Sequence, residues 1–450
     1  MTRVYGAPPA ARPRALVLGI EHPRGIAVVR SLGRRGIPVV GVERDPDARG
    51  RGSRYLQQVV MVEDGDAHTL STLEALAVAP GDLLIPTNDH FLSLVSRHWT
   101  RLARCFTLTV PPWDVLERLM DKPSCYRLAQ GAGLRTPRVV VPGDGAELDA
   151  AVSALDLVAQ RYILSVRLPG DVPADTATGR MTTVAGEDAE TVRARCLAIA
   201  ARTGELPMIA EVVPGRSDRC VGVSMVVDRD QVPVVAYCVR RLQLRLYASD
   251  SRFVHPYELG ANVYCESVRD DEAIEAATRF VRAARFYGAI TVEFRRDARD
   301  EGLTLIKVDP RVVRATSLSS ALGLDVPATL YDVFTGAARP AAAGYPERLA
   351  TGYRERVAWM WPAWYLNTIA QNRGRASVAR QLWAVARNAH RIRAFAYLSV
   401  RDPRPALADL AGFAGYWRAW FRRWLTGTVL PPTSTLGSVA RGLRRRWLVR

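Results

Sequence analysis

The sequence predicts an α/β domain, followed by an α+β region and a basic helical tail. Three observations support this prediction: continuous apolar runs alternate with helical periodicity near the start, strand-like segments dominate the middle, and arginine and tryptophan gather at the end. A length of 450 residues leaves room for about three domains. With 48% apolar and 24% charged residues, the composition is typical of globular proteins and argues against a disordered or fibrous chain.

The first segment alternates strand and helix. Residues 15–20 (ALVLGI) form a continuous apolar run, as expected of a buried parallel strand. A loop with Gly19 and Gly25 follows, then a helical pattern that ends near Gly36 and a second apolar run at 37–42. Strand–helix–strand order is typical of a Rossmann-like sheet, and we assign it residues 1–115, with further strands at 83–86 and 106–110.

The loop after the first strand does not favour a dinucleotide site. Its sequence, GIEHPRG, departs from the GxGxxG pattern that brings a pyrophosphate against the helix N-terminus. Glu43 also lies too close in the sequence to be the usual ribose-binding acid.

Residues 116–337 read as an α+β region with two lobes, about 116–205 and 206–337. Asp121, Lys122 and Pro123 interrupt a helical pattern that runs from Trp113 toward Gly131. Helices are expected at 187–202 and 271–286, and strands at 138–142, 162–168, 208–213, 220–227, 232–239, 289–296 and 303–309. The Ala/Pro-rich stretch 337–343 marks the boundary to the tail.

Residues 289–311 predict a hairpin with charged residues on one face. Thr291, Glu293 and Arg295 alternate on the first strand, and Leu303, Leu305, Lys307 and Asp309 on the second. A turn centred near Asp300 would place Glu293 opposite Lys307 and diagonal to Asp309. Two carboxylates on one face can bind Mg²⁺, which prefers oxygen ligands. Alternatively, this is a solvated hairpin with alternating charge.

The order of these motifs resembles the ATP-grasp superfamily, in particular bacterial carboxylate–amine ligases of the carbamoyl-phosphate-synthase type. The resemblance covers about residues 1–336, and each motif is weak alone. The segments that carry it are DK at 121–122, YILSVRLP at 162–169, MIAEVVPGRSD at 208–218, VEF…LIKVDPR at 292–311 and GLDVPATLYDVFTG at 323–336. The resemblance implies a Rossmann-like pre-ATP-grasp domain and a two-lobed ATP-grasp domain that holds ATP between its lobes.

The resemblance also implies roles for individual residues. Lys122 and Arg167 would contact the nucleotide phosphates, and Asp218 the ribose hydroxyls. Main-chain groups of a hinge would meet adenine. Two carboxylates would bind magnesium, and Arg241, from the basic pair Arg240–Arg241, and Arg311 would act on the transferred phosphate. The hinge residues are Glu211, Val212 and Val213, and the magnesium ligands are Glu293 and Asp309.

The implied function is an ATP- and Mg²⁺-dependent ligase that joins a carboxylate to an amine through an acylphosphate. In phosphoryl transfer, positioning and charge neutralisation do most of the work, which suits these residue types. The expected substrates are small molecules, and a homodimer is left open.

Two departures from the ATP-grasp pattern stand against full activity. Lys307 occupies the place of the usual bridging glutamate, and a protonated lysine cannot ligate a metal. Only two lysines stand among 62 basic residues, so compositional drift toward arginine does not explain this one. The phosphate-covering loop at 166–181 is also poor in glycine. The alternative is a catalytically impaired protein that binds a nucleotide or metabolite and acts as a scaffold at a membrane surface.

The C-terminal region, residues 338–450, is strongly basic. Most of the chain's net charge of +17 lies here, with 19 arginines against four acidic residues after position 340. Trp417, Trp420 and Trp424 share a helical face with Phe413 and Leu410 over a predicted helix at 405–425. This helix packs on the body or binds an anionic membrane, where tryptophan and arginine both suit the headgroup layer. Nucleic acid is the least favoured partner, because no recognised binding motif is present.

Several classes of site are disfavoured. The six cysteines are scattered singly, which argues against zinc ribbons, iron–sulfur clusters and a disulfide scaffold, and the six histidines lack metal-ligand spacing. We expect no signal peptide or membrane-spanning helix, because no long apolar run occurs. The expected location is the cytoplasm, with the tail leaving open a peripheral position at the inner face of the membrane.

Overall fold

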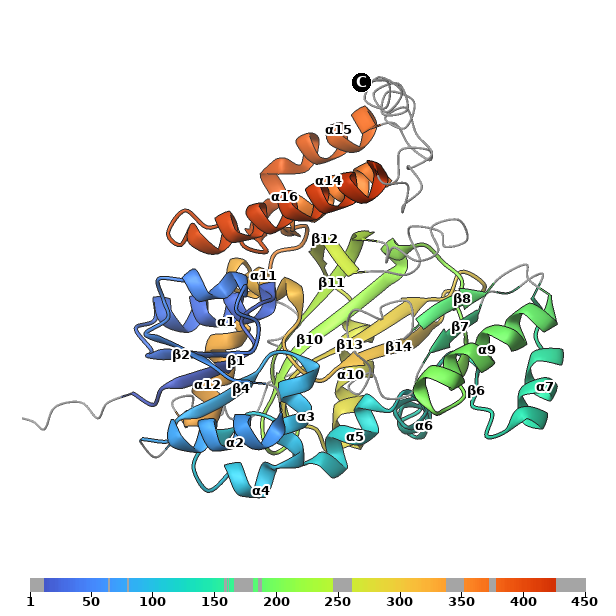
Figure 1. The fold of residues 1–450 in the computed structure, drawn as a ribbon, viewed down its shortest axis with the longest axis horizontal. Coiled ribbons are helices and arrows are strands. Elements are labelled where there is room, and N and C mark those ends of the chain that lie inside the picture. Colours follow the sequence, from blue (N-terminus) through green and yellow to red (C-terminus); the bar gives the residue numbers. More distant parts are fainter. Residues whose placement is uncertain are drawn as a thin grey trace, which may run out of the picture.

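The computed structural model describes residues 12–425 except 64, 79–80, 158–159, 161, 166–180, 185–187, 246–260, 337–351 and 372–377. In this part the chain forms a mixed α/β fold with three sheets (Figure 1). A seven-stranded sheet lies between a five-stranded and a four-stranded sheet, and three C-terminal helices gather at one side. None of the helices in the described part of the chain is both long and apolar enough to span a membrane.

The first sheet is five-stranded and parallel, in the order β3-β2-β1-β4-β5. The expected strand–helix–strand unit is confirmed. All residues of its three central strands are buried, and each fully buried Leu or Val contributes roughly 1.5–3 kcal/mol. Its elements are β1 (Ala15–Leu18), α1 (Pro23–Arg34), β2 (Val39–Glu43), β3 (Gln58–Met61), α2 (Asp66–Ala75), β4 (Leu83–Pro86), α3 (Asp89–Arg97), α4 (Trp99–Leu102) and β5 (Thr107–Leu108).

Two glycines let α1 start close to the end of β1. Gly19 has φ +89°, a conformation that side chains disfavour. A Cβ on Gly25 would lie 2.2 Å from the Gly19 carbonyl oxygen, so any larger residue would push the helix away. The first turn of α1 is therefore held at the carboxyl edge of the sheet, where ligands bind in open α/β sheets.

The second sheet is four-stranded and antiparallel, in the order β6-β9-β7-β8. Its strands lie between residues 139 and 211, and the division into lobes of about 116–205 and 206–337 stays a prediction. Its elements and the two helices before it are α5 (Trp113–Met120), α6 (Lys122–Gly131), β6 (Val139–Val140), α7 (Gly145–Ser153), β7 (Tyr162–Ser165), β8 (Met181–Val184), α9 (Ala189–Thr203) and β9 (Met208–Glu211).

The third sheet has seven strands in the order β14-β13-β10-β11-β12-β15-β16. All neighbouring pairs are antiparallel except β15 and β16. Its elements and nearby helices are β10 (Cys220–Val227), β11 (Pro233–Arg245), β12 (Ala261–Val268), α10 (Asp271–Ala284), β13 (Gly288–Arg296), β14 (Leu303–Asp309), α11 (Ser317–Ala321), α12 (Val326–Thr335), β15 (Ala358–Met360), α14 (Pro362–Gln371), α15 (Val378–Asn388), β16 (Ile392–Phe395) and α16 (Arg404–Leu425).

The C-terminal region is not purely helical, which corrects the prediction for residues 338–450. β15 pairs with β12 and β16 pairs with β15, so this region completes the central sheet. Both strands are short, three and four residues, and short apolar runs do not separate strand from helix by periodicity alone.

The β13–β14 hairpin has the predicted pairing but a different pattern of faces. Glu293 pairs directly with Lys307, as expected. The register then shifts, so that Leu305 pairs with Phe294 and Ile306 is an extra residue. Because of this bulge, Leu305 points into the core and does not share a face with Lys307, against the simple alternation expected from the sequence.

The predicted helix near 405–425 is confirmed as α16, and its described inner face packs on the body. Phe413 contacts the rings of Trp364 and Trp417, and the Asp409 carboxylate accepts a hydrogen bond from Trp361 (2.9 Å). Leu410 lies outward and is 55% exposed, so it does not share the face of Phe413 and Trp417. The side chains of Trp420 and Trp424 lie outside the described residues.

Candidate active site

Lys122 stands at the first position of α6, and two contacts hold it there. Asp121 caps the helix by accepting a hydrogen bond from the Ser124 backbone N–H (3.1 Å). One turn later, the Tyr126 hydroxyl donates to the carbonyl of Ile306, the extra residue of the β14 bulge (2.9 Å). The bulge therefore fixes α6, and with it Lys122, beside the residues that follow Ile306.

The Lys122 ammonium lies near one cation, Lys307, and one neutral acceptor, Ser165. It donates to the Ser165 hydroxyl of β7 (2.7 Å). Burial and the nearby charge of Lys307 lower the pKa of Lys122 to about 8. A half-buried ammonium beside another cation is suited to bind an anion that supplies the missing negative charge.

Lys307 bonds to Asp309, a carboxylate of its own strand. Its ammonium donates to Asp309 (2.9 Å), and not to Glu293 across the hairpin. Although desolvation acts against the charged form, Asp309 and Glu293 hold the pKa of Lys307 above its ordinary value, and half of the side chain is exposed. It thus stays charged at neutral pH.

Arg311 joins the two largest sheets. Its guanidinium donates to Asp89 (2.6 Å), at the start of α3 after β4, and lies 3.2 Å from Asp309. Burial acts to raise the pKa of Asp309, but Lys307 and Arg311 hold it well below its usual range. Asp309 is therefore ionised and shared between two cations.

Glu293 forms an ion pair with Arg241 of β11, and both side chains are largely buried. The structure thus brings together five of the residues predicted from the sequence, Lys122, Arg241, Glu293, Asp309 and Arg311, around Lys307.

These residues, as arranged, do not fit a magnesium site. Glu293 is paired with Arg241, and Asp309 with Lys307 and Arg311, so a metal ion would have to displace bound cations from both predicted ligands. Within the part of the chain that the structure describes, no group of three or more His, Cys, Asp or Glu side chains could hold a metal ion. Magnesium ligation by Glu293 and Asp309 stays a prediction.

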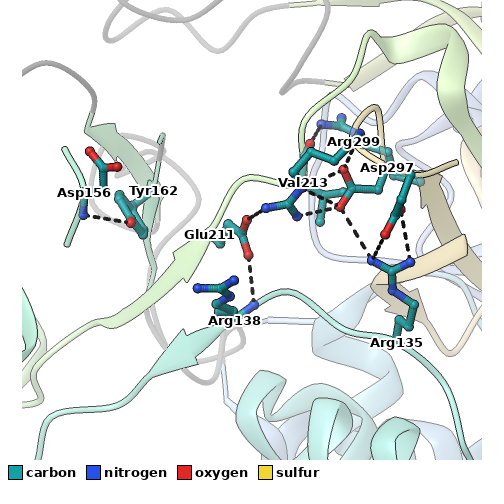
Figure 2. Close-up of polar contacts among 10 residues, drawn as sticks. Arg135, Arg138, Asp156, Tyr162, Glu211, Val213, Asp297 and Arg299 are labelled. Carbon is teal, nitrogen blue, oxygen red and sulfur yellow. Dashed lines mark hydrogen bonds and ion pairs between the residues drawn. The ribbon is translucent and has the colours of Figure 1, made fainter. Parts of the chain in front are cut away.

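The predicted hinge lies at the end of β9 (Figure 2). The Glu211 carboxylate accepts from Arg299 (2.6 Å) and, at 3.4 Å, from the Arg138 backbone N–H. The Val213 carbonyl accepts from the buried Arg295 (2.9 Å). Val212 is buried between them. A carbonyl oxygen has two acceptor positions, so Val213 can still accept a second bond.

The two remaining predicted residues are not drawn into this cluster by any described contact. Asp218 lies 3.6 Å from Arg216, in a short helical turn (Ser217–Arg219), and is 45% exposed. Arg167, like most of the loop at 166–181, lies outside the described residues.

Sequence reasoning missed Asp89, Ser165 and Arg24. Asp89 follows β4 directly, and its signal was the segment LLIPTND, a buried strand that ends in polar residues at the carboxyl edge of a parallel sheet. Arg24 lies in the first turn of α1, and its charge helps to lower the pKa of Asp309. No local pattern predicts that Asp89 lies beside Arg311, or that Arg24 acts on Asp309, because the members of each pair are distant in sequence.

Comparison with solved structures gives the fold. The chain resembles N5-carboxyaminoimidazole synthetase from Staphylococcus aureus (14% identity, 73% of this chain and 78% of that chain, TM-score 0.54). It also resembles biotin carboxylase from Campylobacter jejuni (16% identity, 74% of this chain and 73% of that chain, TM-score 0.54). A third similar structure is the biotin carboxylase domain of 2-oxoglutarate carboxylase from Hydrogenobacter thermophilus, in complex with MgADP, ADP and bicarbonate. It has 13% identity, covers 77% of this chain and 73% of that chain, and has a TM-score of 0.56.

No protein-family model matches the chain, and no curated protein sequence matches it. At 13–16% identity, the structural likenesses show the fold alone. The chain has the ATP-grasp fold.

Proposed function

We propose that this protein is an ATP-dependent ligase that joins a small carboxylate to an amine. The observation that carries the proposal is the cluster of Lys122, Lys307 and Arg311, held between sheets in an ATP-grasp fold. In support, one structural neighbour holds ADP, magnesium and bicarbonate.

In the proposed reaction, an oxygen of the carboxylate attacks the γ-phosphorus of ATP, and the bond to the β-phosphate oxygen breaks to release ADP. The amine then attacks the acylphosphate carbon, loses a proton, and phosphate leaves. Lys122 binds phosphate oxygens, together with Arg167. Arg241 and Arg311 face the transferred phosphate, where neutralisation of the developing charge falls to arginine and lysine side chains.

The adenosine end would lie at the hinge. Main-chain groups of Glu211, Val212 and Val213 meet adenine, and Asp218 binds the ribose hydroxyls. The ion pair between Glu211 and Arg299 supports this assignment because it keeps the end of β9 in one position.

Isothermal titration of the full chain with ATP and ADP, each with and without MgCl₂, tests the proposal. A nucleotide at about 100 times its dissociation constant should also add roughly 2.7 kcal/mol to the free energy of unfolding. ADP release that depends on added carboxylate and amine would then establish ligation. Absence of ATP binding under all these conditions would remove the ligase proposal.

A second proposal concerns the outer face of α16 and is the membrane-surface role. Leu407 and Leu410 are 63% and 55% exposed one helical turn apart, with Arg404 and Arg418 exposed on the same helix. Apolar side chains between arginines suit an anionic lipid surface, and the basic C-terminal region adds charge of the same sign. We place the protein in the cytoplasm, peripheral to the membrane, either as the ligase or as a nucleotide- or metabolite-binding scaffold. The proposal includes a homodimer, because one structural neighbour is described as a dimer.

A further inference from the structure

One buried arginine beside the candidate active site lacks a partner. Arg24 is only 8% exposed, and its Nε has no hydrogen-bond partner. Among the described residues, no carboxylate lies within ion-pair distance of its guanidinium, whereas Arg30 of the same helix bonds to Asp402. A buried cation without a counter-ion is costly, so such a group in a folded protein indicates a ligand.

Two arginines and two carboxylates act on the charge of Arg24. Burial and then the charges of Arg311 and Arg314 lower the pKa of Arg24 to about 9, while Asp89 and Glu21 act against this. Asp89 is already bonded to Arg311 (2.6 Å), so its charge is largely neutralised. An incoming anion would relieve the repulsion among the three arginines.

The helix that carries Arg24 adds to this. His22 precedes the first turn of α1 and makes no side-chain cap hydrogen bond. Burial and the charge of Arg24 lower the pKa of His22 to about 3. The imidazole is therefore neutral at neutral pH. The 12-residue helix contributes a partial positive charge at the same end.

Arg24 and Lys122 lie at different ends of one series of charges. The pKa of Lys122 responds to Lys307, and that of Arg24 to Arg311, which shares Asp309 with Lys307. The proposed nucleotide site uses the Lys122 end. The Arg24 end lies in the first turn of α1, outside the residues assigned to the nucleotide.

We propose that Arg24 and the first turn of α1 form a second oxyanion site, which binds a carboxylate or phosphate group of the acceptor substrate. This inference rests on the proposed ligase function for the identity of its ligand, but the anion site itself can be tested without nucleotide.

The test uses inorganic phosphate and malonate as probes, in thermal unfolding against sodium chloride at equal ionic strength. The comparison is made in the Lys122→Met background, so that anions at the Lys122 end contribute little. Arg24→Met removes the guanidinium that is proposed to bind the anion. Arg34→Met removes the same charge from the exposed last turn of the same helix. Arg24→Lys keeps a cation at the site.

Phosphate or malonate should raise the melting temperature of the Lys122→Met protein and of its Arg34→Met derivative. Arg24→Met should weaken the binding of that anion by at least tenfold, and Arg24→Lys should weaken it by less. The more effective probe identifies the group as carboxylate or phosphate. Without anion, Arg24→Met should melt no lower than its parent, because the substitution removes repulsion.

The proposal is overturned if neither probe stabilises the parent, if Arg24→Met keeps the full response, or if Arg34→Met loses as much. Failure of the ligase proposal would appear differently, as a wild-type chain that binds phosphate or malonate through Arg24 but does not bind ATP.

Discussion

At the scale of single residues, the charge on Lys122 should control nucleotide binding. Its pKa of about 8 means that the ammonium loses its proton as pH rises through this value, and attraction to phosphate is lost with it. We expect the dissociation constant for ATP to rise about tenfold between pH 7 and pH 9, as one titrating group predicts. Isothermal titration over this range measures it.

Two substitutions serve as controls for this prediction. Lys122→Arg keeps the charge at every accessible pH and should flatten the dependence, whereas Lys122→Met should bind weakly throughout. Equal ATP affinity in wild type and Lys122→Met at pH 7 would remove this residue from the nucleotide site.

We expect the charge of Lys307 to control magnesium binding at the β13–β14 hairpin. Repulsion between its ammonium and each unit of positive charge at 4 Å is roughly 4 kcal/mol at an effective dielectric constant of 20. Lys307→Glu removes this charge, frees Asp309 from one ion pair and adds a carboxylate opposite Glu293. We expect tighter magnesium binding in the presence of ADP, and faster ATP turnover.

Lys307→Met is the matched control, because it removes the charge without adding a ligand. It should give an intermediate magnesium affinity in a calorimetric titration. If Lys307→Glu and wild type bind magnesium equally, Glu293 and Asp309 are not metal ligands.

At the scale of elements, the outer face of α16 should determine membrane attachment. Leu407→Ser combined with Leu410→Ser changes exposed side chains and should leave the fold intact. Sedimentation with vesicles of phosphatidylglycerol and phosphatidylcholine should show severalfold weaker binding. Binding of the wild type should also fall with added salt, because exposed charges are screened over about 10 Å at 0.1 M.

A leucine on another helix provides the control. Leu197 of α9 is 39% exposed, and Leu197→Ser should bind vesicles like wild type. Equal vesicle binding by all three proteins would exclude this face as the contact. Substitution is a better test than removal of residues 341–450, because that deletion takes β15 and β16 out of the central sheet.

At the scale of the whole molecule, a buried ion pair ties the C-terminal region to the first sheet. Arg30 of α1 bonds to Asp402 (2.9 Å) and to the Tyr397 carbonyl (2.7 Å), and Asp402 also accepts from Ser53 (2.8 Å). Asp402→Ala would leave a buried guanidinium unpaired, and we expect a loss of about 3–5 kcal/mol in unfolding free energy.

Asp332 of α12 provides the control, because it also pairs with an arginine at α1. It bonds to Arg35, the residue after α1, in a partly exposed ion pair, so Asp332→Ala should cost less than about 1 kcal/mol. Urea denaturation of both variants measures the difference. Equal small losses would mean that Asp402 does not secure the C-terminal region.

The sequence by itself determined the elements whose signal is local. β1, α1 and β2 follow from apolar runs separated by helical periodicity, and β10 and β14 have the predicted bounds. The pairing of Glu293 with Lys307 was also predictable, because strand alternation and the Asp/Gly-rich turn fix it within one hairpin. The role of Lys122 in nucleotide binding stays a prediction from the resemblance, which rests on short motifs in a fixed order.

Only the tertiary structure decided which charges meet. Arg311 bonds to Asp89 across 222 positions, and Arg30 to Asp402 across 372. The bulge at Ile306 and the addition of β15 to β12 likewise depend on how separate elements pack. Local periodicity states which face of an element is buried but not against what, so the partners of Lys307, Arg24 and Glu293 could be read only after the sheets were assembled.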